Sequence, residues 1–203
     1  MQDFVSFFFL LIVITIFYVH LENKSLDVVY VNTNGRNYLV RNLPDKEEAA
    51  KIMDTLNTKF KHLINACVEN CDKNKNYTEQ NKIDIKRLKN NYNENNISES
   101  SPGNKHTSYS INKGEKIVFC IRSKDGKNTI IDINTITFVG IHELAHLMTK
   151  SIGHNQEFWD NMKFLLKVAI ENGIYTPQDF NKNPVEYCGT MITDTPLKVS
   201  NNV

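Results

Sequence analysis

The sequence has almost no excess of charge of either sign. Its 24 Lys and Arg residues nearly balance 23 Asp and Glu residues, which leaves a net charge of +1 over 203 residues. A protein that holds nucleic acid through the phosphates needs a positive surface field, and this composition supplies none. We therefore expect no nucleic-acid partner. The length suits one domain of ordinary size with short appendages.

Cysteine is also scarce. The chain contains Cys67, Cys71, Cys120 and Cys188. They are too few and too scattered for a disulfide scaffold. The first two have helical i, i+4 spacing, but a zinc site there would need two more ligands, and none is evident nearby. We interpret the cysteines as reduced thiols in a reducing compartment.

Charged residues are absent from residues 4–21, which read FVSFFFLLIVITIFYVHL. A helix over this stretch would span about 27 Å, close to the hydrocarbon core of a bilayer. We predict an uncleaved transmembrane anchor over residues 1–24, with membrane contact through residues 4–21. A cleaved signal peptide is one alternative, although the basic n-region and the small-residue cleavage site are missing. A buried core helix is another.

The charges that flank this run indicate an orientation. Asp3 precedes the run, whereas Lys24, Arg36 and Arg41 follow it. Basic residues favour the cytosolic side of a membrane. We therefore expect a single-pass membrane protein whose C-terminal domain lies in the cytosol.

The rest of the chain alternates short strand and helix patterns, which is typical of an α+β domain. We place this domain at residues 25–195. Residues 90–106 are rich in Asn and Ser and predict a flexible loop inside it. Residues 196–203 are expected to form a loose tail.

Individual elements of the domain can be placed from turn signals and periodicity. Asn34–Gly35 separates two short apolar runs, as in a β-hairpin. Pro44 opens a helix with an apolar stripe that continues to Cys67. Further strands, helices and one extended piece are expected at residues 109–111, 116–122, 129–133, 134–150, 155–172 and 187–192.

The chemistry centres on His142-Glu-Leu-Ala-His146, a His-Glu-x-x-His pattern on a predicted helix. Positions i and i+4 share a helix face, so His142 and His146 can direct two imidazoles at one metal ion. Glu143 lies at the edge of that face, where it can act as general base on a metal-activated water. The pattern predicts a Zn2+ hydrolase that cleaves peptide bonds without a covalent intermediate.

The sequence around this motif predicts a third metal ligand. The helix is apolar nearly all round and should be buried, where an unsatisfied polar group costs about 1–3 kcal/mol. A bound metal would satisfy its histidines. Gly153 supplies a turn that can bring His154 back toward the site. Glu157 and Glu171 are the alternative third ligands.

These residues carry a resemblance to a known family. The helix motif, the Gly153–His154 turn and the aromatic pair Phe158–Trp159 resemble the WLM, SprT-like and YgjP-like zinc metallopeptidases over residues 107–172. The resemblance implies a zincin-like domain with a small mixed or antiparallel sheet packed on helices. It also implies a Zn2+ cofactor and a protein or peptide substrate.

A longer pattern is similar to membrane-anchored WLM-like proteins of large DNA viruses. It includes residues 38–46 and 185–189. That similarity implies a location in a viral or host-cell membrane. The strand at residues 116–122 would lie beside the cleft as an edge strand. Tyr187 would stabilise the oxyanion, as a tyrosine does in many zincins, with a merely packed tyrosine as the alternative.

Two departures from the family pattern limit what can be carried over. The gap from His146 to His154 is longer than usual, so a wider loop must absorb the difference. Several family members act on DNA-bound proteins, which does not suit this neutral chain. The alternative function is a non-catalytic membrane or virion scaffold protein with a structural zinc site. Glu143 favours the enzyme, because a structural site needs no base.

Overall fold

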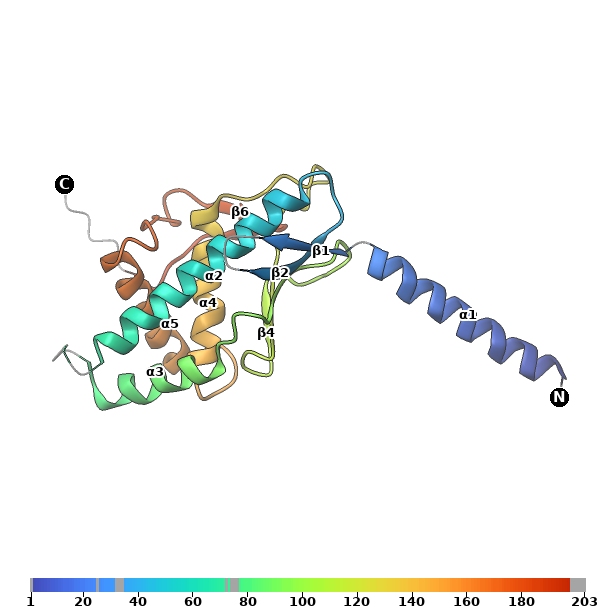
Figure 1. Ribbon diagram of the computed structural model, residues 1–203. Coiled ribbons are helices and arrows are strands. Elements are labelled where there is room, and N and C mark those ends of the chain that lie inside the picture. Colours follow the sequence, from blue (N-terminus) through green and yellow to red (C-terminus); the bar gives the residue numbers. More distant parts are fainter. Residues whose placement is uncertain (1, 25, 32–34, 72, 74–76, 198–203) are drawn as a thin grey trace.

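The fold was analysed in a computed structural model that describes residues 2–24, 26–31, 35–71, 73 and 77–197. Helices and strands within these ranges follow one another as shown in Figure 1. They are α1 (Gln2–Lys24), β1 (Leu26–Val31), β2 (Arg36–Arg41), α2 (Lys46–Glu69), α3 (Glu79–Asn91), β3 (Ile97–Glu99), β4 (Tyr109–Ile111), β5 (Lys116–Phe119), α4 (Ile133–Met148), α5 (Gln156–Glu171), β6 (Val185–Tyr187) and β7 (Thr190–Ile192).

The main sheet is mixed, with strand order β1-β2-β3-β5-β4. The outer pairs β1–β2 and β4–β5 are antiparallel, whereas β3 runs parallel to both of its neighbours. Strands β6 and β7 form a separate antiparallel hairpin. Together with the helices this confirms the predicted α+β class. The prediction of an edge strand at residues 116–122 is wrong: β5 lies between β3 and β4, and β4 is the edge strand on that side of the sheet.

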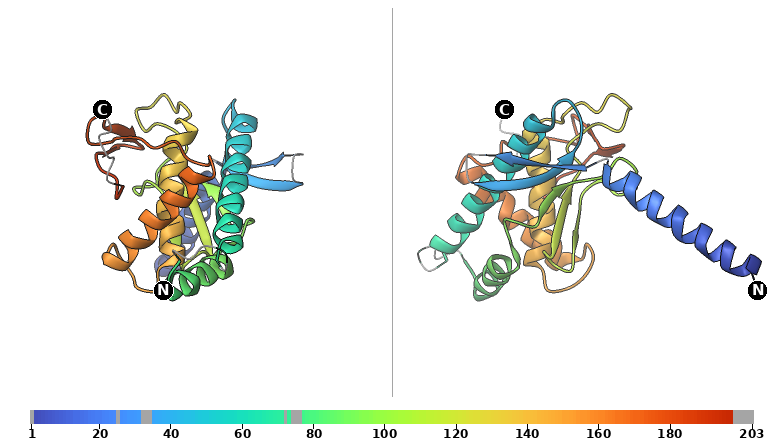
Figure 2. Two further views of the ribbon diagram at one scale, coloured as in Figure 1. Left: turned by 90° about the vertical axis from the view of Figure 1, so that its left-hand side faces the viewer. Right: turned by 45° about the vertical axis from the view of Figure 1, so that its right-hand side comes forward.

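Helix α2 builds one side of the core because its apolar residues recur at helical spacing. It packs against β2 and against α4, and Figure 2 shows the two helices close to the sheet. Phe60 of α2 is completely buried, and its ring lies against Gly140 of α4. The helix that carries the His-Glu-x-x-His motif is therefore held between α2, α3 and α5.

Two sequence-based assignments differ from the structure. The predicted loop at residues 90–106 contains β3, which lies in the middle of the sheet. The predicted strand at residues 129–133 is reduced to an isolated bridge between Arg122 and Ile130. Asn34 of the predicted hairpin turn and tail residues 198–203 lie outside the described residues.

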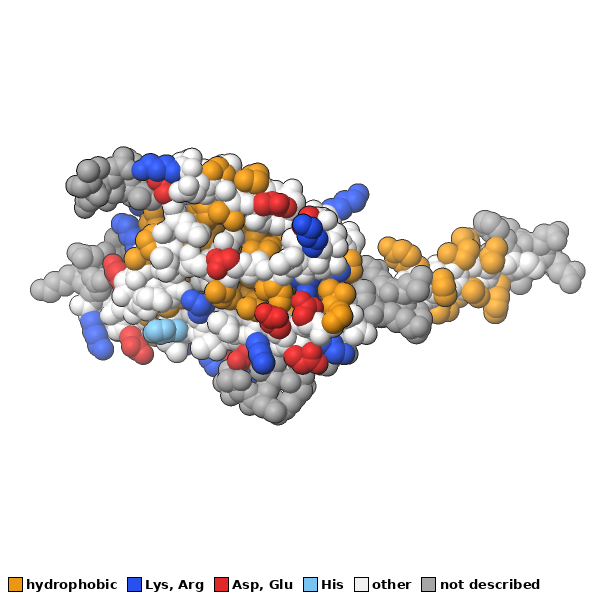
Figure 3. Space-filling view, turned by 90° about the horizontal axis from the view of Figure 1, so that it is seen from above, with side chains coloured by type: hydrophobic (Ala, Val, Ile, Leu, Met, Phe, Trp, Pro, Cys, Tyr) orange, Lys and Arg blue, Asp and Glu red, His pale blue; other side chains and the backbone are white. Residues whose placement is uncertain are grey.

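The prediction of a single-pass membrane protein is wrong. Helix α1 forms as expected and projects away from the rest of the chain (Figure 1), and those of its hydrophobic side chains that the structure describes, between Phe8 and Val19, are exposed (Figure 3). However, no helix in the described ranges is sufficiently long and apolar to cross a membrane. The predicted membrane contact through residues 4–21 is not supported either.

The interpretation of the cysteines as reduced thiols is wrong for two of them. Cys120 and Cys188 form a buried disulfide, with their Cα atoms 6.3 Å apart and a separation of 68 positions in sequence. The bond attaches the β6–β7 hairpin to the residue that follows β5. Sequence spacing could not reveal this pair, because only the fold brings the two positions together.

Candidate metal centre

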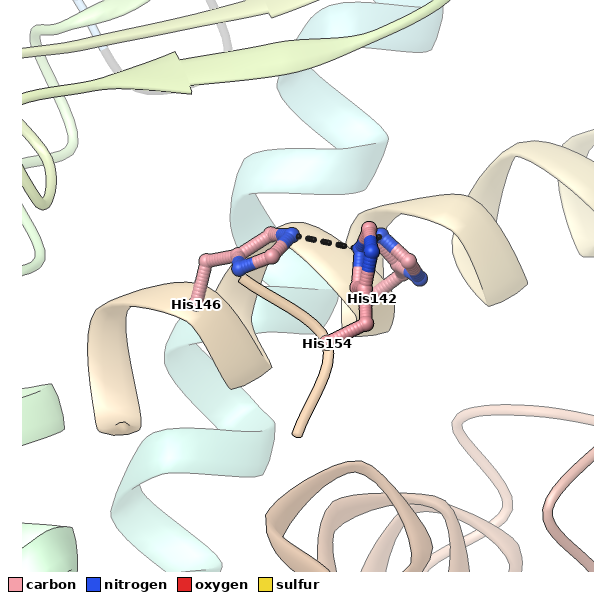
Figure 4. A group of neighbouring side chains, drawn as sticks. All are labelled: His142, His146 and His154. Atoms are coloured by element: carbon pink, nitrogen blue, oxygen red, sulfur yellow. Dashed lines mark hydrogen bonds between the residues drawn. The ribbon is translucent and has the colours of Figure 1, made fainter. Parts of the chain in front are cut away.

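Helix α4 presents the two motif histidines on one face. It begins at an Asp132 cap, whose carboxylate accepts a hydrogen bond from the Thr135 N–H at 2.9 Å. Its apolar residues are buried, which confirms the prediction for this helix. The ring centroids of His142 and His146 lie 4.9 Å apart. His154 reaches the same point from the connection after the helix, as Figure 4 shows.

The three imidazoles converge on a single position. His154 Nε2 lies 3.0 Å from His142 Nε2 and 3.1 Å from His146 Nε2. One ring nitrogen cannot share a single proton well with two neighbours, whereas one cation can accept three lone pairs. Tetrahedral nitrogens at 2.0–2.1 Å from zinc lie about 3.3 Å apart. The donor set therefore fits a metal ion of this kind.

The environment keeps two of these rings neutral. Burial, reinforced by the other histidines, lowers the pKa of His142 to about 3. Burial also lowers the pKa of His146 to about 4, with His154 and Lys113 acting in the same direction. Neutral imidazole is the form that binds metal, so these two rings need not lose a proton before coordination.

Glu143 lies beside the histidines and is only 4% exposed. Burial raises its carboxyl pKa to about 7, against the opposing effect of hydrogen bonds from Ser110. Ser110 belongs to the edge strand β4. The carboxyl group thus lies between α4 and the edge strand β4, where it can exchange a proton near neutral pH.

Aromatic rings pack beneath the histidines. The Phe158 ring centroid lies 4.8, 4.4 and 4.6 Å from those of His142, His146 and His154 respectively. The Trp159 ring lies 5.7 Å from that of His154. Both aromatic residues stand in the first turn of α5, which Asn155 caps by accepting from the Phe158 N–H. The start of α5 therefore limits how the histidine rings can rotate.

The three histidines line a cleft of about 980 Å³. One wall is formed by residues 107–110, which include part of the edge strand β4. Ile152 and Trp159, both exposed, contribute apolar surface on the lining near His154. A cleft with one strand edge and some apolar surface suits an extended peptide.

The alternative third ligands lie elsewhere. The Glu157 carboxylate accepts hydrogen bonds from the Lys150 N–H at 2.8 Å and the Ser151 hydroxyl at 2.6 Å. Glu171 is exposed at the last residue of α5. Among the described residues, the potential ligands that gather within 4.8 Å of one another are His142, His146 and His154.

Tyr187 is buried next to the cleft rather than exposed in it. Only 2% of its surface is accessible, and its hydroxyl group lies 2.7 Å from Ser108 Oγ. Ser108 lines the cleft and also accepts the Cys120 N–H at 3.1 Å. Sequence reasoning did not find Ser108 or Ser110, because isolated serines before and within a short strand give no signal of their own.

Known proteins resemble the chain in sequence. A sequence model of the WLM domain matches residues 80–201. Protein R325 of Acanthamoeba polyphaga mimivirus is 36% identical over 192 residues, which cover 92% of this chain and 93% of that protein. Protein 136R of Invertebrate iridescent virus 6 is 39% identical over 83 residues, covering 40% of this chain and 44% of that protein. The predicted similarity to proteins of large DNA viruses is confirmed.

A solved structure is also similar. The crystal structure of a Wss1 mutant from Saccharomyces cerevisiae aligns with a TM-score of 0.48 and 17% sequence identity. The alignment covers 67% of this chain and 91% of that one.

Proposed function

The chain belongs to the WLM domain family, and from this premise we propose that it is a zinc-dependent peptidase with a zincin-like catalytic domain. Membership supports a metallopeptidase-type function with a metal cofactor and a protein substrate. One observation carries the more specific proposal. Three imidazole nitrogens converge beside a buried carboxyl group on the lining of a cleft.

In this proposal His142, His146 and His154 hold the ion and leave one position open toward the cleft. A zinc ion bound there would lower the pKa of a water ligand toward neutrality and polarise the substrate carbonyl. The packing of Phe158 against all three rings keeps them in position. Pre-oriented ligands reduce the ordering that binding would otherwise require.

Glu143 is the general base. It follows the first ligand directly in sequence, and burial removes it from competing bulk water. Its carboxylate takes a proton from the attacking water and delivers that proton to the leaving amine. The hydrogen bonds from Ser110 orient the carboxyl group during both transfers.

The substrate is a protein or peptide segment in extended conformation. β4 is an edge strand, so its outer side can pair with an added strand. Residues 107–110 line the cleft next to the histidines, which would place a paired backbone close to them.

Tyr187 has a secondary role as stabiliser of the oxyanion. Burial, together with the nearby Glu143, raises the pKa of its hydroxyl group, so the group remains a hydrogen-bond donor. In the present conformation the Tyr187 hydroxyl group is hydrogen-bonded to Ser108. This hydrogen bond must break before the hydroxyl group can donate to the substrate. Tyr187→Phe should lower kcat about 100-fold while zinc content stays unchanged. An unchanged kcat would leave Tyr187 as a packing residue.

Glu143→Gln tests the proposed function. The variant should retain zinc and lose peptide cleavage by at least about 100-fold, because the ligands remain and the base is removed. Zinc is measured by elemental analysis and cleavage with a broad peptide library. Glu171→Gln is the matched control, since it makes the same chemical change at an exposed position, and it should retain both properties.

Two results would contradict this function. Undiminished cleavage by Glu143→Gln would exclude Glu143 as the base. A wild-type chain that binds zinc yet cleaves nothing in the library would favour the alternative, a non-catalytic protein with a structural metal site.

A further inference from the structure

The connection between the second and third histidines determines where His154 lies. α4 ends at Met148, and α5 begins at Gln156. Within this connection Ile152 is 92% exposed, and Gly153 adopts a φ of 86°. A segment that buries so little of its own surface has low intrinsic stability, so contacts from other elements must hold it in place.

The last turn of α4 leaves backbone carbonyl groups without partners inside the helix, as any helix end does. The Thr149 N–H satisfies Ala145 O at 2.9 Å. Side chains of other elements supply the donors for the next carbonyls. These pairs are Lys113 Nζ to His146 O at 3.0 Å, Asn91 Nδ2 to Leu147 O at 2.9 Å, and Arg87 Nη1 to Met148 O at 2.6 Å.

Among these donors, Lys113 also reaches past the helix. Its Nζ lies 2.9 Å from Thr149 O and 2.7 Å from Ser151 O, in addition to the contact with His146 O. A lysine ammonium group has three N–H donors, and three carbonyl acceptors can use all of them. The Lys113 side chain therefore joins the end of α4 to the connection that leads to His154.

Lys113 is itself held firmly. It stands in the turn between β4 and β5 with a φ of 58°. Gly114 follows with a φ of 114°, and a Cβ atom at that position would lie 2.1 Å from Asn91 O. The turn is thus packed directly against the end of α3. This packing fixes the backbone of Lys113 and so restricts where its ammonium group can lie.

We propose that Lys113 is a positioning residue for the metal centre, which holds the connection after α4 so that His154 stays over His142 and His146. This inference rests on the proposed function. It also explains how a long gap between the second and third histidines is accommodated: the extra residues form a turn whose carbonyl groups are bound by one ammonium group.

Lys113→Met in the full chain tests this role, because methionine keeps the side-chain length and removes the donors. Zinc affinity is measured by competition with a chromophoric chelator. The variant should bind zinc about tenfold more weakly than wild type, as expected when a residue that orients a ligand is lost. Lys116→Met removes an exposed lysine from the same hairpin and should bind as wild type does.

A His154→Ala background separates positioning from a general effect on the fold. If Lys113 acts through His154, the Lys113→Met change should weaken zinc binding little further in that background. Lys113→Arg, which retains several donors, should recover part of the lost affinity. If Lys113→Met does not fold, Lys113→Leu, which also lacks donors, takes its place with the same expectation.

The outcomes are distinguishable. A folded Lys113→Met chain with wild-type zinc affinity would overturn the positioning role while leaving the proposed function intact. An equal loss in the wild-type and His154→Ala backgrounds would also overturn it. A wild-type chain without zinc affinity would overturn the proposed function, and this inference with it.

Discussion

Gly140 allows α4 to approach α2 closely, two residues before the first histidine of the motif. A Cβ atom there would lie 2.2 Å from Cζ of Phe60, whose side chain is completely buried. Gly140→Ala should therefore destabilise the protein by about 1–3 kcal/mol through overpacking. This would occur although alanine normally favours a helix over glycine by about 1 kcal/mol. Urea unfolding measures the change.

Combining Gly140→Ala with Phe60→Leu provides the control, since the smaller side chain makes room for the new methyl group. The double variant should lose less stability than the sum of its two single changes. If Gly140→Ala alone is as stable as wild type, the contact between these helices is looser than the structure shows.

At the level of single residues, the sequence predicted what helical periodicity can place. His142 and His146 share a face of a buried helix, and the Gly153 turn brings His154 to them. Lys113 could not be predicted to contact this site. It is 33 positions from His146 in sequence and stands in a hairpin turn, so only the fold brings the two together.

The connection from α4 to α5 gains pH-dependent stability from Glu157. Hydrogen bonds from the Ser151 hydroxyl and the Lys150 N–H hold the pKa of this carboxyl below its usual 4.5. Its stabilising contribution is therefore present above pH 4.5 and is lost as pH falls through the lower native pKa. Glu157→Gln should reduce the free energy of unfolding by about 1 kcal/mol at pH 7.

The difference between Glu157→Gln and wild type should shrink as the pH falls below 4.5 and through the lowered native pKa, because the wild-type carboxyl then also becomes neutral. Urea unfolding at a series of pH values measures it, with Glu171→Gln as an exposed control. A difference that is independent of pH would show that Glu157 acts through packing rather than through its charge.

The β6–β7 hairpin is fastened to the sheet through its turn. Cys188 and Gly189 have φ values of 52° and 82°, as in a tight two-residue hairpin turn, and Cys188 is bonded to Cys120. The bond closes a long loop, so removing it should cost about 2–5 kcal/mol. A reducing agent should lower the Tm of the wild-type chain.

The Tm of a Cys120→Ser, Cys188→Ser double variant should not respond to the reducing agent. The variant itself should already unfold at a lower temperature than oxidised wild type. A wild-type Tm that is the same with and without reductant would argue against this bond as a stabilising link.

Elements with strong local signals were predictable, and those stabilised by distant partners were not. The β1–β2 hairpin and the Asn155 cap of α5 follow from turn and cap chemistry. β3 was missed because it is short and carries a buried Glu99, where alternation would require an apolar residue. Glu99 accepts hydrogen bonds from Arg122 Nε at 2.8 Å and Arg41 N at 2.7 Å, which makes its burial tolerable.

For the whole molecule, the fold class followed from the alternation of strand and helix patterns, and the family from the motif. The localisation could not be predicted correctly from the sequence. A run of apolar residues was interpreted as a bilayer span, and no described helix qualifies as one. Cysteine chemistry did not follow either, since Cys120 and Cys188 are joined only in the folded chain. Properties that depend on distant pairs or on surroundings outside the chain are therefore the ones that sequence reasoning missed.

The zinc content of the purified full chain tests the central claim most directly. Elemental analysis should find close to one zinc per chain, because the imidazoles of His142, His146 and His154 converge on one position. His142→Ala should reduce that content to near zero, and a chelator should lower the Tm of wild type but not of the variant. A wild-type chain without zinc, whose Tm does not respond to chelators, would contradict the account.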